Sequence, residues 1–218
     1  MGTAQGIESL DVRIVDWVRN NRRTALVGAV VIALIAGGTW FWWTARERRE
    51  AFAERALGSA RSSAEAGNLP LASSDLARLI STYGGTRAAQ EATLLLSQVR
   101  LLQNQAPMAV GELRKFVASG PRSEFRGPAN GLLGAALEEA GQAGDAAKAY
   151  EAAAAATPYR GVKAQYLVDA ARSYTIAGDT ATAAKIYEQL IRDFKDQSSA
   201  VEAQVRLAEI RPLLTKPS

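Results

Sequence analysis

The chain has 218 residues, with 26 Lys and Arg against 22 Asp and Glu, for a net charge of +4. It contains neither Cys nor His, which excludes disulfides and thiolate metal sites and removes the commonest metal ligand and the usual general base. There is no basic block with interleaved aromatics and no Gly-rich phosphate loop. We therefore expect a non-enzymatic protein with no cofactor, no metal and no nucleic-acid partner.

Residues 24–43 form an uncharged, mostly apolar stretch. As a helix it is about 30 Å long, the thickness of the hydrocarbon core of a bilayer. Its far end carries an aromatic cluster typical of the membrane interface: Trp40, Phe41, Trp42 and Trp43. A buried helix of a soluble protein would carry a polar stripe, and a cleaved signal peptide would end in small residues rather than bulky aromatics. The stretch is predicted to be a single transmembrane helix.

Small residues recur every four positions inside this stretch. A face of this kind lets a second helix approach closely, although Ala and Gly are also simply common in membrane helices. The predicted packing face consists of Ala25, Ala29, Ala33 and Gly37.

Residues 1–23 precede the span, and within them 7–19 show the pattern of an amphipathic helix lying in the membrane interface. A disordered terminus is the alternative. Four arginines lie before the span and four follow it at similar distances, so the positive-inside rule does not decide the orientation.

From residue 44 to 211 the sequence predicts an all-α domain of helices divided by Gly, Asn and Pro, with one of the predicted breaks at Gly127-Pro128. Five sets of positions recur at a step of 37 residues. Turn residues that tolerate a positive φ are Gly67, Asn104, Gly141 and Gly178. The second helix of each pair has Ala72, Ala109, Ala146 and Ala183, then Leu76, Leu113, Tyr150 and Tyr187, then Leu79, Phe116, Ala153 and Leu190. The first helix has only small residues, at Ala60, Ser97, Gly134, Ala171 and Ala208.

This pattern predicts an α-solenoid of about four helix pairs and a closing helix over 199–211, followed by a tail over 212–218. A small residue in the middle of helix A lets helix B cross closely, and a larger residue on helix B fills the gap to the next pair. The columns resemble the tetratricopeptide repeat, which has small residues at two fixed positions and a Pro near its end, as at Pro121 and Pro158. The period is longer than the 34 residues usual for that repeat.

The order of the whole chain, and most specifically IVDWVRNNRRTALVGAVVIALIAGGTWFWW, resembles the YfgM-like family of ancillary SecYEG translocon subunits. This resemblance implies a bacterial inner-membrane protein with a cytoplasmic N-terminus and periplasmic repeats. It also implies association with the translocon and with periplasmic chaperones.

The leading hypothesis is a membrane-anchored scaffold whose repeats bind proteins, with membrane lipid and other membrane-protein subunits as further partners. The candidate groove residues lie on helix A faces: Gln98, Glu138, Glu139 and Arg172. For any single one of them, an ordinary solvated side chain is the alternative. A second hypothesis is a structural subunit of a large photosynthetic or respiratory membrane complex, capping it on the periplasmic side. The pair Glu138-Glu139 does not indicate catalysis, because adjacent helix positions point about 100° apart.

Overall fold

The computed structural model describes residues 21–214, and in that range it consists of helices joined by short turns, with no strand. The expected all-α class is confirmed. The helices are α2 (Arg22–Glu65), α3 (Leu69–Thr82), α4 (Arg87–Leu102), α5 (Ala106–Ala118), α6 (Ser123–Glu139), α7 (Ala143–Ala156), α8 (Arg160–Ile176), α9 (Thr180–Asp193) and α10 (Ser198–Leu214). The amphipathic helix predicted over 7–19 lies outside the described residues.

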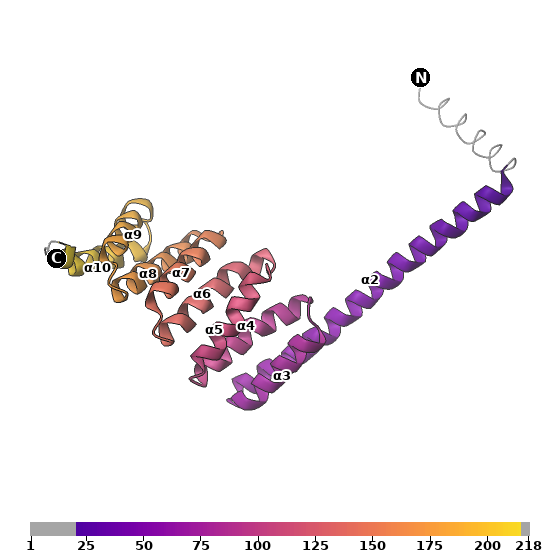
Figure 1. Ribbon diagram of the computed structural model, residues 1–218, viewed down its shortest axis with the longest axis horizontal. Helices are drawn as coiled ribbons and strands as arrows, with labels where there is room; N and C mark the ends of the chain where they lie inside the picture. Colours follow the sequence, from indigo (N-terminus) through magenta and orange to yellow (C-terminus); the bar gives the residue numbers. More distant parts are fainter. Residues whose placement is uncertain (1–20, 215–218) are drawn as a thin grey trace, which may run out of the picture. The chain divides into compact units, whose positions relative to one another are not determined.

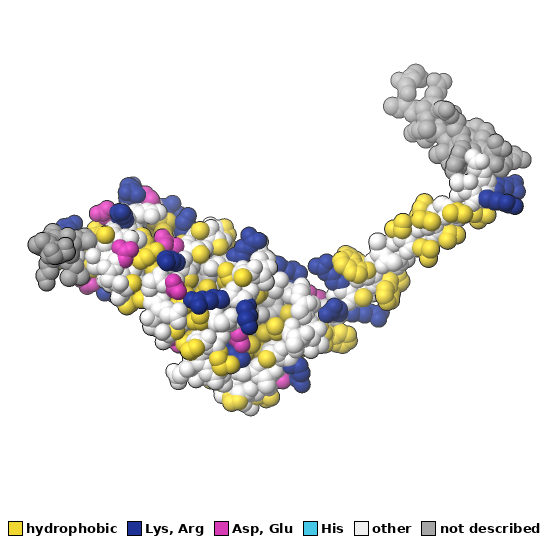
Figure 2. Space-filling model, viewed as in Figure 1, with side chains coloured by type: hydrophobic (Ala, Val, Ile, Leu, Met, Phe, Trp, Pro, Cys, Tyr) yellow, Lys and Arg dark blue, Asp and Glu magenta, His cyan; other side chains and the backbone are white. Residues whose placement is uncertain are grey.

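The chain divides into two compact units, Met1–Arg49 and Glu50–Ser218, and the boundary falls within α2. The first unit contains the apolar part of this helix. By length and composition α2 is the only helix between residues 21 and 214 that is able to cross a membrane, a property that signal sequences share. Its large apolar side chains are exposed, Leu34 to 71%. Apolar side chains cover this part of α2 in Figure 2, with Lys and Arg at both of its ends.

The second unit is a stack of helix pairs, each helix packing against the next one along the chain (Figure 1). The end of α2 packs with α3, followed by the pairs α4/α5, α6/α7 and α8/α9, and by α10. Helix A of one pair also contacts helix A of the next, as α4 does with α6 and α8 with α10. The predicted solenoid of about four pairs and a closing helix is therefore present. Helix α10 continues through Pro212 to Leu214, so it overlaps the predicted tail.

The turn between the helices of each pair has the same backbone conformation. All four residues of the turn column have a positive φ, between 58° at Asn104 and 86° at Gly178. A residue with a Cβ is strained in this region, whereas Gly adopts it freely and Asn tolerates it. The prediction that these four positions are turns with a positive φ is therefore confirmed.

We expect Gly141→Ala and Gly144→Ala to change stability in opposite directions. At Gly141, φ is 72° and an added Cβ would meet nothing within 4 Å, so the left-handed backbone alone should cost about 1 kcal/mol. Gly144 lies inside α7, and its Cβ would come no closer than 3.8 Å to Ala177. Ala should therefore stabilise that helix by about 0.5–1 kcal/mol. Urea unfolding of residues 50–218 measures both changes, and two shifts of the same sign would contradict this account of the turn.

The packing columns are buried as the repeat pattern predicts. The four Ala residues of the helix B column are fully buried, and the larger residues four positions on are at most 5% exposed. In the helix A column, Gly134 shows why the residue must be small: an added Cβ would lie 2.7 Å from the ring of Tyr150 on α7. Two members depart from the pattern, since Phe116 is half-buried and Ala208 is exposed.

The predicted break at Gly127-Pro128 is wrong. Helix α6 continues through both residues, although Pro128 cannot donate a backbone hydrogen bond. Packing around the proline offsets this loss, because Phe125 and Ala129 on either side of it are buried in the stack. At Gly127 an added Cβ would lie 3.5 Å from Cβ of Thr157, an ordinary contact distance, so α6 lies close to the end of α7 at this point.

Candidate functional site

One carboxylate joins three consecutive helices of the stack, α6, α7 and α8. Glu138, near the end of α6, receives hydrogen bonds from Tyr150 Oη on α7 at 3.0 Å and from Ser173 Oγ on α8 at 2.7 Å. Arg172 Nη2 lies 3.0 Å from Glu138 Oε2, and Arg172 Nη1 lies 3.3 Å from a carboxylate oxygen of Asp169. We call these five residues the Glu138 network.

The electrostatics of the network favour a fixed structure. Burial, together with the neighbouring Glu138 carboxylate, raises the pKa of Tyr150. Its hydroxyl therefore stays protonated and donates a hydrogen bond to Glu138. Burial also raises the pKa of Asp169, while the positive charge of Arg172 opposes this shift. Arg172 lies between two carboxylates, so much of its charge is already balanced inside the repeat stack. The network therefore holds α6, α7 and α8 in register.

The structure brings together two of the four predicted groove residues. Glu138 and Arg172 form an ion pair, with side chains 21% and 44% exposed. Glu139 and Gln98 are exposed on α6 and α4 and take no part in the network. Sequence reasoning assigned Tyr150 only to core packing and did not include Ser173.

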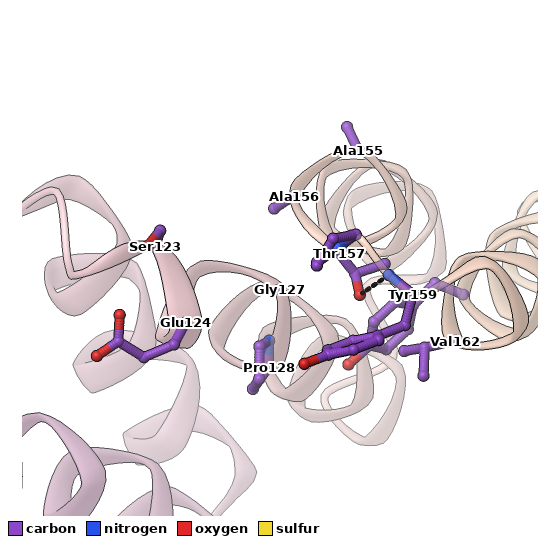
Figure 3. A pocket seen from close by; sticks show the side chains of 11 residues that line it. Ser123, Glu124, Gly127, Pro128, Ala155, Ala156, Thr157, Tyr159 and Val162 are labelled. Carbon is purple, nitrogen blue, oxygen red and sulfur yellow. Dashed lines mark hydrogen bonds between the residues drawn. The ribbon is translucent and has the colours of Figure 1, made fainter.

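A separate apolar cleft of about 750 Å³ lies between the start of α6, the end of α7 and the start of α8. Its walls include Pro128, Ala155, Tyr159, Val162 and Tyr166. Figure 3 shows Tyr159 reaching from the α7–α8 connection toward Pro128, with its backbone N–H donating to Thr157 Oγ1 at 3.4 Å. A cleft of this size and lining has room for one or two apolar side chains.

Glycines on α6 help to form this cleft. The Cβ position of Gly131 lies 2.5 Å from Cε1 of Tyr166, so only a glycine there lets the Tyr166 ring lie against α6. Tyr159 and Val162 remain 70% and 43% exposed, which is unusual for large apolar side chains beside a pocket. Glu124 is also among the lining residues and gives the cleft an acidic neighbour, although its carboxylate points away from Tyr159 and Val162 (Figure 3). The repeat columns contain none of these residues, so the sequence pattern did not indicate the cleft.

In the first unit, the four predicted interface aromatics are all exposed, between 60% at Trp42 and 72% at Trp40 and Phe41. Of the predicted packing face, Ala33 is exposed, and an added Cβ at Gly37 would meet nothing within 4 Å. The side chains of Ala25 and Ala29 lie outside the described part. The face remains a prediction.

Comparison with known proteins gives the family. Residues 16–126 and 48–170 match the tetratricopeptide repeat-like domain. The chain belongs to this family. Among curated proteins there is no match.

Solved structures agree with the tetratricopeptide repeat-like assignment at the level of fold. One similar structure is a protein of Podosopora anserina, described as a putative kinesin light chain with nearly identical TPR-like repeats. It has a TM-score of 0.60 and 20% identity, covering 73% of this chain and 85% of the other. The structure of a single-substitution variant of that protein gives the same values. The tetratricopeptide repeat-like fold is that of a protein–protein interaction scaffold, typically without catalytic activity.

Proposed function

We propose that this protein is a membrane-anchored scaffold of the bacterial inner membrane. The observation that carries the proposal is one chain joining an exposed, uncharged apolar helix to a stack of tetratricopeptide-like repeats. In this proposal residues 24–43 span the membrane, the N-terminus is cytoplasmic and the repeats are periplasmic. The partners are other membrane-protein subunits, such as those of the translocon, and periplasmic proteins such as chaperones.

The anchor rests on the hydrophobic effect. Side chains such as Leu26, Ile32 and Ile35 are more than 60% exposed on α2, and each large apolar side chain gains about 1.5–3 kcal/mol when it leaves water. A soluble monomer rarely exposes a continuous apolar surface of this kind. Lipid would cover this part of α2 on all sides, which also fits the absence of charge across residues 24–43.

The cleft beside Tyr159 is the proposed contact for a partner protein. Its apolar walls suit an aromatic or aliphatic side chain, and Glu124 suits a basic residue next to it. The occupant we propose is an extended segment of the partner that presents an apolar residue beside Lys or Arg. The Glu138 network supports this contact indirectly by fixing α6, α7 and α8, the helices that form the cleft.

Capture of partners from mild detergent tests this assignment. Val162→Asp places a charge in the cleft, and the first turn of α8 tolerates an acidic residue, so the fold should survive. We expect partner capture to fall by roughly tenfold or more, the cost of leaving a charge unpaired at a buried contact. Val201→Asp is the matched control, since Val201 is exposed in the first turn of α10 and away from the cleft. Equal capture by wild type and Val162→Asp would remove the cleft from the proposal.

Location is tested by fusing alkaline phosphatase after Ser218, because this enzyme is active only after export. We expect an active fusion. An inactive fusion, with a cytoplasmic reporter active at the same point, would reverse the orientation. The translocon and a large photosynthetic or respiratory complex are distinguished by which subunits co-purify with the full chain.

A further inference from the structure

The segment that follows the apolar stretch carries a notch on one face of α2. Its lining residues are Trp40, Phe41, Thr44, Ala45 and Arg48, and it encloses about 190 Å³. The lining residues follow the i, i+4, i+8 spacing of a single helix face, with large side chains at both ends and small side chains between them. Thr44 donates its hydroxyl to the carbonyl of Trp40 at 2.7 Å, so its hydrogen bond is satisfied within the helix. The notch is thus bounded by the aromatic rings of Trp40 and Phe41 and by the cationic side chain of Arg48. The short side chains of Thr44 and Ala45 lie between them.

Two arginines that follow the apolar stretch lean back toward it, Arg48 on the face of the notch and Arg46 on the opposite face of α2. Side chains on a helix point toward its N-terminus, and here that direction leads to the span. The guanidinium carbon of Arg46 accordingly lies 5.4 Å from the ring centroid of Trp42, one turn back. Arg48 reaches the same notch as Trp40, two turns back. Within residues 21–214, neither Arg46 nor Arg48 forms an ion pair with a carboxylate.

The depth of these groups corresponds to the phosphate layer of a bilayer. Arg46 and Arg48 follow Trp43 by three and five residues, a rise of about 4.5 and 7.5 Å along the helix. The headgroup region is about 5–8 Å thick on each side of the hydrocarbon core. Side chains that lean back from these positions place their guanidinium groups among the phosphates. The aromatic wall then lies beside the glycerol and the start of the acyl chains.

We infer that this notch, with Arg48 at its cationic end, binds the phosphate of an anionic phospholipid. A guanidinium pairs with phosphate through two parallel hydrogen bonds, and Arg is more weakly hydrated than Lys, so it suits this boundary. Anionic lipid is preferred because a zwitterionic headgroup carries its own cation, which competes for the phosphate and repels Arg48. Glu47 is the nearest acidic neighbour on this segment and reduces the local charge without removing it. The inference rests on the proposed membrane anchor.

The test uses the full chain in phosphatidylcholine vesicles with a trace of spin-labelled phosphatidylglycerol or phosphatidylcholine. The measured quantity is the fraction of each label that the protein immobilises. We expect the wild type to prefer phosphatidylglycerol several-fold, because the Arg48 guanidinium pairs with its phosphate through charge-assisted hydrogen bonds and its headgroup carries no competing cation. Arg48→Gln should lose most of this preference, whereas Arg46→Gln, on the opposite face of α2, should keep it. Thr44→Leu fills the notch without changing the charge and should lower it as well.

Arg22→Gln is a second matched control, because it removes the same charge from the other end of the apolar stretch, where no aromatic cluster lies. It should keep most of the preference. An equal loss in Arg48→Gln and in either control, or no preference in the wild type, would overturn the inference. If millimolar inorganic phosphate abolishes the preference, the ligand is free phosphate rather than lipid, which also overturns it. Flotation with vesicles separates the lipid site from the membrane anchor on which it rests. A chain that does not float with the vesicles contradicts the membrane anchor. A chain that floats but shows no lipid preference contradicts only the lipid site in the notch.

Discussion

Ala171→Leu is expected to lower the free energy of unfolding of the repeat domain by about 1–3 kcal/mol. Ala171 is fully buried in the middle of α8, in the column whose members are all small. Helix α9 packs against α8, and Ala183 and Tyr187 on α9 are also buried. Three additional carbons have no space there, so the helices must separate or the side chain must leave its preferred rotamer. Urea unfolding followed by circular dichroism measures the loss.

Ala208→Leu is the matched control for this substitution. Ala208 occupies the same column on α10, but it is exposed. The same change should therefore alter stability by no more than about 0.5 kcal/mol. If both variants unfold at the wild-type urea concentration, the small column has no packing role and the repeat register is wrong.

Glu138→Ala is expected to destabilise the domain by about 1–3 kcal/mol. The substitution removes the acceptor for the buried Tyr150 hydroxyl, and a buried donor without a partner costs about that amount, whereas Ser173 can still donate to the backbone carbonyl of Asp169. The ion pair with Arg172 contributes less, because the Arg172 side chain is 44% exposed and water screens the charges. Unfolding at neutral pH measures the change.

Glu139→Ala controls for helix propensity and net charge. Glu139 is the next residue on α6, is exposed and lies outside the network. Its substitution should change stability by less than about 0.5 kcal/mol. Equal effects at the two positions would mean that the Glu138 network does not hold the three helices together.

The repeat architecture could be predicted from sequence because it depends on backbone and volume rules that each repeat obeys separately. The turn column needs a residue that tolerates positive φ, and Asn104 meets this requirement as the glycines do. The helix A column needs small residues, and Gly134 shows the steric reason directly. Four repetitions of such local requirements make a pattern that one sequence displays.

The candidate sites depend on contacts that do not repeat. Tyr166 lies against Gly131, and Tyr159 overhangs the cleft, in only one repeat. The continuation of α6 through Pro128 follows from tertiary packing, which outweighs the local preference of proline to end a helix. Two of the candidate groove residues, Glu138 and Arg172, form an ion pair, and the hydrogen bond from Ser173 to Glu138 joins residues that no repeat column contains.

Partner capture by the full chain and by residues 46–218 tests most directly whether the protein is a membrane-anchored scaffold. Both are compared with the same membrane extract in mild detergent. A contact through the cleft alone must offset the lost rotational and translational freedom of both proteins. The anchor confines the repeats beside their partner at an effective concentration that can reach millimolar. We predict that the fragment stays folded and recovers roughly tenfold less partner than the full chain. Equal recovery by the fragment would contradict the account, because recognition would then need no membrane.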